Sequence, residues 1–256
     1  MIKGIDKFKN HFKAYNNQYV VIGGFACDLL MNDVGIDFRA TKDVDLVLIV
    51  EALSNDFVKA IWDFIKEGEH KTGKRKNGEC EYYRFISPKN EDYPSMIELF
   101  SRPQNNIKID DGNHLIPLIP DDDDLSSLSA ILLNDDYYKL LLNGSIKIND
   151  ISILDKEYLI LFKIRAWVDL TTKKRNGEFV RTKDINKHKQ DVFRLSRLLT
   201  GDEIIEVPAS IKNDINVFIK EMRNNDYELS SIGIKETKDN VLNMLNKIFI
   251  VNNNNK

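Results

Sequence analysis

Residues 21–50 read VIGGFACDLLMNDVGIDFRATKDVDLVLIV, and this stretch decides the predicted fold. One apolar run ends at the glycine pair Gly23-Gly24, and a second apolar run begins right after Asp43 and Asp45. Burying a charged group costs free energy unless the charge is paired or holds a metal ion. Two aspartates at the head of a strand that otherwise reads as buried therefore need a physical reason.

The glycine pair lies where a predicted strand, 19–23, meets a predicted helix, 25–31. Glycine at such a junction lets the backbone approach a phosphate group closely, and the helix N-terminus adds amide donors. A tight strand–helix turn explains a bare glycine pair equally simply. Gly23 and Gly24 are therefore candidate phosphate-binding residues, and a purely structural turn is the alternative.

The two aspartates flank Val44 in the predicted strand 44–50. Residues i and i+2 of a strand point to the same face, so Asp43 and Asp45 project together. Two carboxylates this close repel each other unless one is protonated or a cation lies between them. An oxygen-preferring divalent ion, Mg²⁺ or Mn²⁺, would resolve the conflict. The alternative is a solvated strand end, because the loop residues Ala40–Lys42 precede it.

Glu98 is the lone acid inside the apolar pattern SMIELF, residues 95–100. Such a residue either faces water at a sheet edge or serves as a ligand. If its strand lies beside the strand of Asp43 and Asp45, three carboxylates converge. Such a group could hold two metal ions about 3.5–4 Å apart for in-line phosphoryl transfer.

The rest of the chain predicts an α/β protein with a mixed β-sheet flanked by helices, followed by a C-terminal helical domain. Further strands are expected at 80–87 and 95–100, and a helix at 54–67. A polar, acidic and proline-bearing stretch after Arg102 reads as a linker or surface loop, which places the domains at 1–125 and 126–250. The second domain is expected to hold one strand or hairpin at 146–154, then helices within 155–174, 187–200, 210–225 and 237–251. We expect 251–256 to be a disordered tail.

Composition limits the classes of function. The 256 residues are 42% hydrophobic and 30% charged with a net charge of −3, as in a soluble globular protein, so any nucleic-acid contact must be a local patch. Two isolated cysteines form neither a disulfide framework nor a zinc motif, and the four histidines lack ligand spacing. With neither a signal peptide nor a membrane span expected, we predict a cytoplasmic protein without a membrane partner.

The order of these motifs resembles the nucleotidyltransferase superfamily of the polymerase-beta type: a glycine pair, a short helix, D-x-D heading a strand and a later lone acid. RATKDVDL, residues 39–46, is similar to the Arg-x-Thr/Ser-x-Asp-hydrophobic-Asp-Leu signature of the AbiEii-like nucleotidyltransferase toxins. LFKIRAWVDL, residues 161–170, is similar to the lysine-bearing motif of that family, and KHKQDVFRL, residues 187–195, to its Lys-x-x-Asp motif. The connection at 31–37 is longer than the family pattern.

The resemblance implies a role for each candidate residue. Gly23 and Gly24 would cradle the triphosphate of an NTP, and Arg39 and Thr41 would contact phosphate or brace the loop. The metal-binding residues would be Asp43, Asp45 and Glu98, with Glu98 also the general base.

Two further candidates lie in the predicted helical domain. Lys163 would contact the triphosphate, and Asp191 would act in or buttress the active site. The alternatives are a lysine that extends along its helix toward solvent and an i,i+4 pair of Asp191 with Lys187.

The implied activity is a metal-dependent nucleotidyltransferase of the EC 2.7.7 type. It would transfer NMP from an NTP to a hydroxyl group, using two Mg²⁺ ions or Mn²⁺ in their place. The acceptor would be a tRNA 3′ end or a protein, and the chain would be the toxin of an abortive-infection or toxin–antitoxin system with a cognate antitoxin. The alternatives are a small-molecule, aminoglycoside-like acceptor and a non-catalytic module that binds a nucleotide or a partner.

Overall fold

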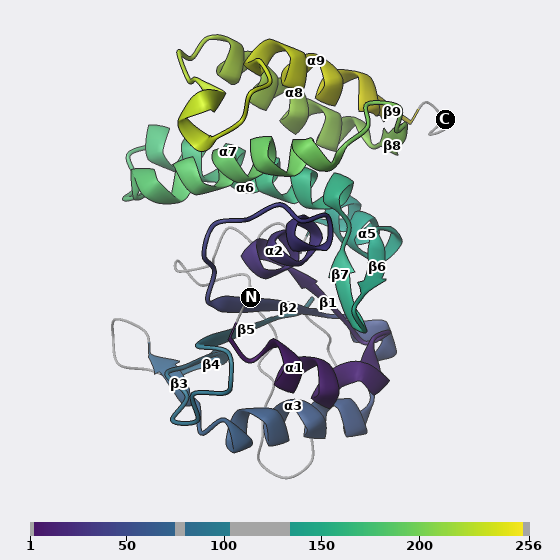
Figure 1. Ribbon diagram of the computed structural model, residues 1–256, viewed down its shortest axis with the longest axis vertical. Helices are drawn as coiled ribbons and strands as arrows, with labels where there is room; N and C mark the ends of the chain where they lie inside the picture. The colour runs from purple at the N-terminus through teal and green to yellow at the C-terminus, as the bar shows by residue number, and fades with distance from the viewer. Residues whose placement is uncertain (1–2, 75–79, 103–133, 253–256) are drawn as a thin grey trace. The chain divides into compact units, whose positions relative to one another are not determined.

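The structure is a computed structural model that describes residues 3–74, 80–102 and 134–252 (Figure 1). Contacts divide these residues into two units. The first unit contains the described residues of 1–125 together with Ser145–Asp155, and the second contains those of 126–144 and of 156–256. The predicted linker at 103–127, the acidic run at 121–124 and most of the basic stretch at 73–79 lie outside the described residues.

The first unit is built on a mixed seven-stranded sheet with the strand order β3-β4-β5-β2-β1-β7-β6. Its centre consists of β1, β2 and β5. β2 runs antiparallel to β1 and parallel to β5. The strands are β1 (Tyr19–Ile22), β2 (Asp43–Leu48), β3 (Lys71–Lys74), β4 (Cys80–Ile86), β5 (Met96–Phe100), β6 (Ser145–Ile148) and β7 (Ile151–Leu154).

Helices α1 (Ile5–Phe12) and α3 (Asn55–Glu67) run side by side along the sheet (Figure 1). Between them and β1 lies an aromatic cluster in which Phe8 contacts Phe12, Tyr19 and Phe64 at ring-centroid distances of 4.8–6.0 Å. These rings are at most 2% exposed, so they remove much apolar surface from water. Ser54 caps α3 by accepting a hydrogen bond from the Phe57 amide, as its sequence predicts. The cluster anchors the strand that ends at the glycine pair.

Helix α2 (Gly23–Asp33) begins at the first glycine of the pair and packs against β1 and β2. Its C-terminus is a Schellman motif: the Gly35 amide donates to the Asn32 carbonyl and the Ile36 amide donates to the Met31 carbonyl. Gly35 has φ +73°, which a glycine adopts without strain. The long connection at 31–37 is therefore the helix end itself, and the chain after it returns to β2.

The predicted hairpin at 146–154 is present, but it belongs to the first unit. β6 and β7 form it, and β7 pairs in parallel with β1 through Val21 and Ile153. Its tight turn places Asn149 and Asp150 at φ +50° and +62°, a left-handed conformation that asparagine and aspartate tolerate. The sheet of the first unit therefore recruits a segment that the sequence alone assigned to the helical domain.

The second unit is mainly helical. Helix α6 is apolar around much of its circumference, and residues 159–162 are all at most 4% exposed, as expected for a central helix. It packs against α5, α7 and α8. The helices are α5 (Asp135–Asn143), α6 (Lys156–Arg175), α7 (Thr182–Leu195), α8 (Ala209–Arg223) and α9 (Lys238–Ile248). Short 3-10 helices lie at Lys13–Tyr15, Val50–Ala52, Ser196–Leu198 and Leu229–Ile232.

Some elements differ from the sequence expectation. The helix expected to reach residue 251 ends at Ile248, and Phe249–Val251 forms β9, which pairs in parallel with β8 (Ile205–Val207). Val251 therefore belongs to a strand and not to a disordered tail, while 253–256 lie outside the described residues. Lys71–Lys74 form an antiparallel strand with β4, where a basic turn was expected from residue 73 onward.

Among the helices of the described ranges, none combines the length and the apolar character needed to cross a lipid bilayer.

Candidate functional site

The glycine pair packs directly against the predicted metal-binding loop. Gly23 has φ +73°, and a Cβ at this position would lie 1.9 Å from Asp45 Oδ2. A Cβ at Gly24 would lie 2.7 Å from Thr41 Oγ1 and 3.3 Å from Arg39 Nη2. The absence of side chains at these two glycines is therefore what lets three predicted site residues approach the N-terminus of α2.

Asp43 and Asp45 lie on one face of β2, and the intervening Val44 is fully buried on the other face. Both aspartates are half-buried, so neither is a freely solvated strand end. Asp45 is the register partner of Ile22, the last residue of β1 before Gly23. The sheet thus fixes the Asp45 carboxylate beside the start of α2.

Glu98 lies on β5, which the structure places directly beside β2. The pairing is parallel and in register, with Asp45 opposite Glu98 and Asp43 opposite Met96. Register partners project to the same face of a sheet, so Glu98 shares a face with both aspartates. The glycine pair, Asp43, Asp45 and Glu98 are therefore brought together at one place in the first unit.

Arg84 is a site residue that the sequence argument missed. It lies on β4 opposite Glu98, and its Nε donates to Glu98 Oε1 at 2.6 Å. The side chains are 34% and 13% exposed, so the ion pair is partly shielded from water. A lone arginine in the apolar strand EYYRFI and a lone glutamate in MIELF are the sequence signal for such a cross-strand pair.

The donor set has the chemistry that Mg²⁺ and Mn²⁺ prefer, because all three side chains offer carboxylate oxygens. Within the described ranges, no group of three or more Asp, Glu, His or Cys side chains stands close enough together to form a metal cluster. Glu98 is instead held by Arg84. A metal ion that used all three carboxylates would therefore compete with the Arg84 guanidinium for Glu98.

Lys163 and Asp191, the two candidates from the helical domain, form a buried ion pair in the second unit. Lys163 Nζ of α6 lies 3.1 Å from Asp191 Oδ2 of α7, and the residues are 5% and 0% exposed. Arg194 Nη1 lies 3.7 Å from the other oxygen of Asp191. The Lys163 ammonium does not extend into solvent, and the structure pairs Asp191 with a lysine of the neighbouring helix.

Two further ionisable groups have shifted pKa values. Burial raises the pKa of the Asp28 carboxyl on α2, and a hydrogen bond from Asn32 partly offsets this effect. Burial lowers the pKa of Lys189 on α7, whose ammonium lies 4.0 Å from the centre of the Tyr227 ring. Asp28 also lines a cavity of about 480 Å³ between α1, α2 and the β6–β7 turn.

Comparison with models of known protein families gives no match to this chain. Comparison with curated protein sequences gives no significant match either. What the chain shows by itself is an α/β unit with a mixed sheet flanked by helices and, at the centre of that sheet, a glycine pair beside three carboxylates on two adjacent strands.

Proposed function

We propose that the chain is a metal-dependent nucleotidyltransferase with the polymerase-beta type of fold, and that it belongs to the AbiEii-like toxins. The observation that carries the proposal is the register Ile22–Asp45–Glu98 across three adjacent strands, with Gly23 in contact with Asp45. This arrangement gives a physical reason for three half-buried acids that a simple turn or strand end does not. The close approach of the half-buried Arg39 and Thr41 to Gly24 supports the role of the signature RATKDVDL.

Asp43, Asp45 and Glu98 would hold two Mg²⁺ ions. When bound, the ions would supply charge stabilisation for the triphosphate and for the attacking and leaving oxygens. The amides at the start of α2 would bind phosphate oxygens, since the helix N-terminus presents unsatisfied N–H donors. Glu98 would accept the proton of the acceptor hydroxyl.

Arg84 would compete with the metal ions for Glu98 in this scheme. It donates to Glu98 Oε1 from the neighbouring strand, so Glu98 would have to turn from Arg84 to bind a metal ion. Lys163 would contact the triphosphate, with Asp191 holding its ammonium in place. The products would be pyrophosphate and an acceptor carrying a new phosphodiester.

The candidate functions differ in the acceptor of the nucleotide. An AbiEii-like toxin would modify a tRNA 3′ end or a protein hydroxyl in the cytoplasm, and a cognate antitoxin would restrain it. A small-molecule acceptor of the aminoglycoside kind is the second candidate, because the same carboxylates would serve it. A non-catalytic nucleotide-binding module is the third candidate, and calorimetry with NTP and Mg²⁺ separates it, since it would bind without turnover.

The test is transfer of label from each α-³²P-labelled NTP, with Mg²⁺, to total RNA, to protein and to aminoglycosides. We expect Mg²⁺-dependent transfer by the wild type and none by Asp43→Asn with Asp45→Asn. Asp37→Asn is the matched control, because Asp37 is an exposed acid of the preceding loop and should retain full activity. Transfer that survives the double substitution, or a wild type inactive on all three acceptors, would contradict the proposal.

A further inference from the structure

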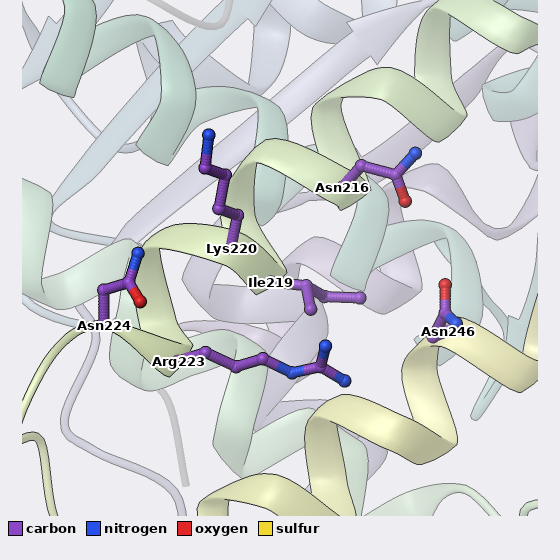
Figure 2. A pocket seen from close by; sticks show the side chains of 6 residues that line it. All are labelled: Asn216, Ile219, Lys220, Arg223, Asn224 and Asn246. Atoms are coloured by element: carbon purple, nitrogen blue, oxygen red, sulfur yellow. The ribbon is translucent and has the colours of Figure 1, made fainter.

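A groove between α8 and α9 of the second unit has a lining that favours an anionic ligand (Figure 2). Its volume is about 340 Å³, and the side chain of Ile219, only 6% exposed, forms part of its lining. Figure 2 shows Asn216 and Lys220 projecting from α8, with Asn246 on α9. Spacings of three and four residues place the α8 side chains on one face of the helix. The remaining lining residues are Arg223 and Asn224.

No carboxylate of the described residues lines this groove. Lys220 makes no ion pair with any described residue, and Arg223 donates to the neutral Asn243 of α9 at 2.8 Å. The acid next to Lys220 in sequence, Glu221, is 2.7 Å from Arg175 instead. Among the described residues, these two cations thus have no carboxylate partner, on a chain whose net charge is −3.

Several other basic side chains of the second unit do have carboxylate partners. Arg165 pairs with Asp214, Lys173 with Asp169, and Arg181 with Asp184. Lys212, near the other end of α8, donates to the Asn246 side chain and to the carbonyls of Asn246 and Phe249. The Asn246 amide is therefore oriented by the protein, with its oxygen toward Lys212 and its N–H groups left for another acceptor.

We propose that this groove binds the phosphate backbone of a single-stranded RNA. Lysine, arginine and carboxamide side chains are the usual partners of backbone phosphates. The lining has no aromatic ring for base stacking and no exposed apolar pocket for a peptide side chain, so its contacts suit a charged backbone better than bases or apolar side chains. The choice of RNA rests on the proposed transfer to an RNA acceptor, whereas the binding of phosphate rests on the groove alone.

The experiment measures fluorescence anisotropy of a labelled 20-nucleotide single-stranded RNA with the full chain at several salt concentrations. The groove variant is Lys220→Gln with Arg223→Gln. The matched control is Lys139→Gln with Lys235→Gln, which removes two exposed cations of the same unit outside the groove.

Losing two phosphate contacts should reduce the slope of log K against log salt by about 1.4. The wild type should therefore lose about sevenfold more affinity than the groove variant between 50 and 200 mM salt. The control should keep the wild-type slope. Equal binding of single-stranded DNA of the same sequence supports backbone recognition.

Four results would each overturn the groove proposal. The groove variant could bind RNA as the wild type does, or the control variant could lose as much affinity. The wild type could fail to bind RNA, or polyglutamate at equal charge could displace the RNA. Binding of labelled NTP with Mg²⁺ is measured on the same samples and should not change in the groove variant. RNA binding without nucleotide transfer would count against the proposed function and leave the groove standing.

Discussion

At Gly23 one residue sets both a backbone conformation and a side-chain approach. Its φ of +73° strains any L-amino acid, and a Cβ would lie 1.9 Å from Asp45 Oδ2. Gly35 has the same φ of +73° but no atom within 4 Å of its Cβ position. Comparing substitutions at Gly23 and Gly35 therefore separates the cost of backbone strain from the cost of displacing Asp45, the candidate metal ligand.

We predict that Gly35→Ala lowers the free energy of unfolding by about 1 kcal/mol, the strain of the left-handed conformation alone. Gly23→Ala should lower it by about 2–4 kcal/mol, because the Asp45 carboxylate must also move. It should abolish nucleotide transfer as well. Urea denaturation measures the free energy of unfolding of both variants, and the labelled-NTP assay measures their activity. Equal losses of unfolding free energy in the two variants would show that the Asp45 side chain moves aside at no cost, against the prediction.

At Arg84 the guanidinium competes with a metal ion for Glu98. Arg84→Met leaves three carboxylates with less neutralising charge, so we expect Mn²⁺ to bind about tenfold more tightly, or ~1.4 kcal/mol. Arg84→Lys keeps the positive charge and serves as the control with little change. Electron paramagnetic resonance of free Mn²⁺, without nucleotide, measures the affinity directly; weaker binding by Arg84→Met would rule out the competition.

At Asp28 burial raises the pKa of the carboxyl above its ordinary 3.8. The folded state therefore holds the proton more tightly than the unfolded state, and stability from this group is lost as pH rises through the folded pKa. Asp28→Asn should stabilise the protein at pH 7, and the gain should shrink as pH falls toward 3.8. Exposed Asp33→Asn is the control, with a change below ~0.5 kcal/mol. Denaturation curves at pH 7 and near 4 test this, and a gain that grows on acidification would refute it.

At the scale of elements, α6 and α7 are joined by the buried pair Lys163–Asp191. Removing one partner leaves a buried charge, so Asp191→Asn should cost about 3–5 kcal/mol of unfolding free energy. Arg181→Gln, in the exposed pair Arg181–Asp184, should cost less than ~1 kcal/mol.

Replacing both members of the buried pair, Lys163→Met with Asp191→Leu, should recover most of the stability. If Lys163 also contacts the triphosphate, this refolded double variant should still fail to transfer nucleotide. Thermal denaturation and the transfer assay on the same samples distinguish the two roles. Full activity in the stable double variant would leave the pair a purely structural contact.

The strands of the first unit show which parts of the fold can be predicted from the sequence and which cannot. The central strands were predictable because β-branched runs and turn residues mark them locally, and Asp43 and Asp45 share a face by the period of any strand. The adjacency of β2 and β5 was not predictable, because the register of Asp45 with Glu98 joins residues more than 50 apart. Arg84 was missed for the same reason, since only that register gives it Glu98 as a partner.

At the scale of the whole molecule, the chain leaves the first unit and returns to it. The composition change after Arg102 marked the first domain limit, but nothing local to 145–154 shows that β7 completes the sheet beside β1. A short apolar hairpin fits either unit by pattern, and only pairing with Val21 decides it. Similarly, the sequence of Phe249–Val251 continues the helical periodicity of α9, but these residues form a strand because they pair in parallel with β8.

The most direct test of the account is an experimental structure of the full chain with a non-hydrolysable NTP and Mg²⁺. We predict metal density bridging Asp43 and Asp45, Glu98 within reach of the metal and turned from Arg84, and the triphosphate at the amides of Gly23 and Gly24. Nucleotide and metal bound elsewhere, with the Arg84–Glu98 pair intact, would contradict the account.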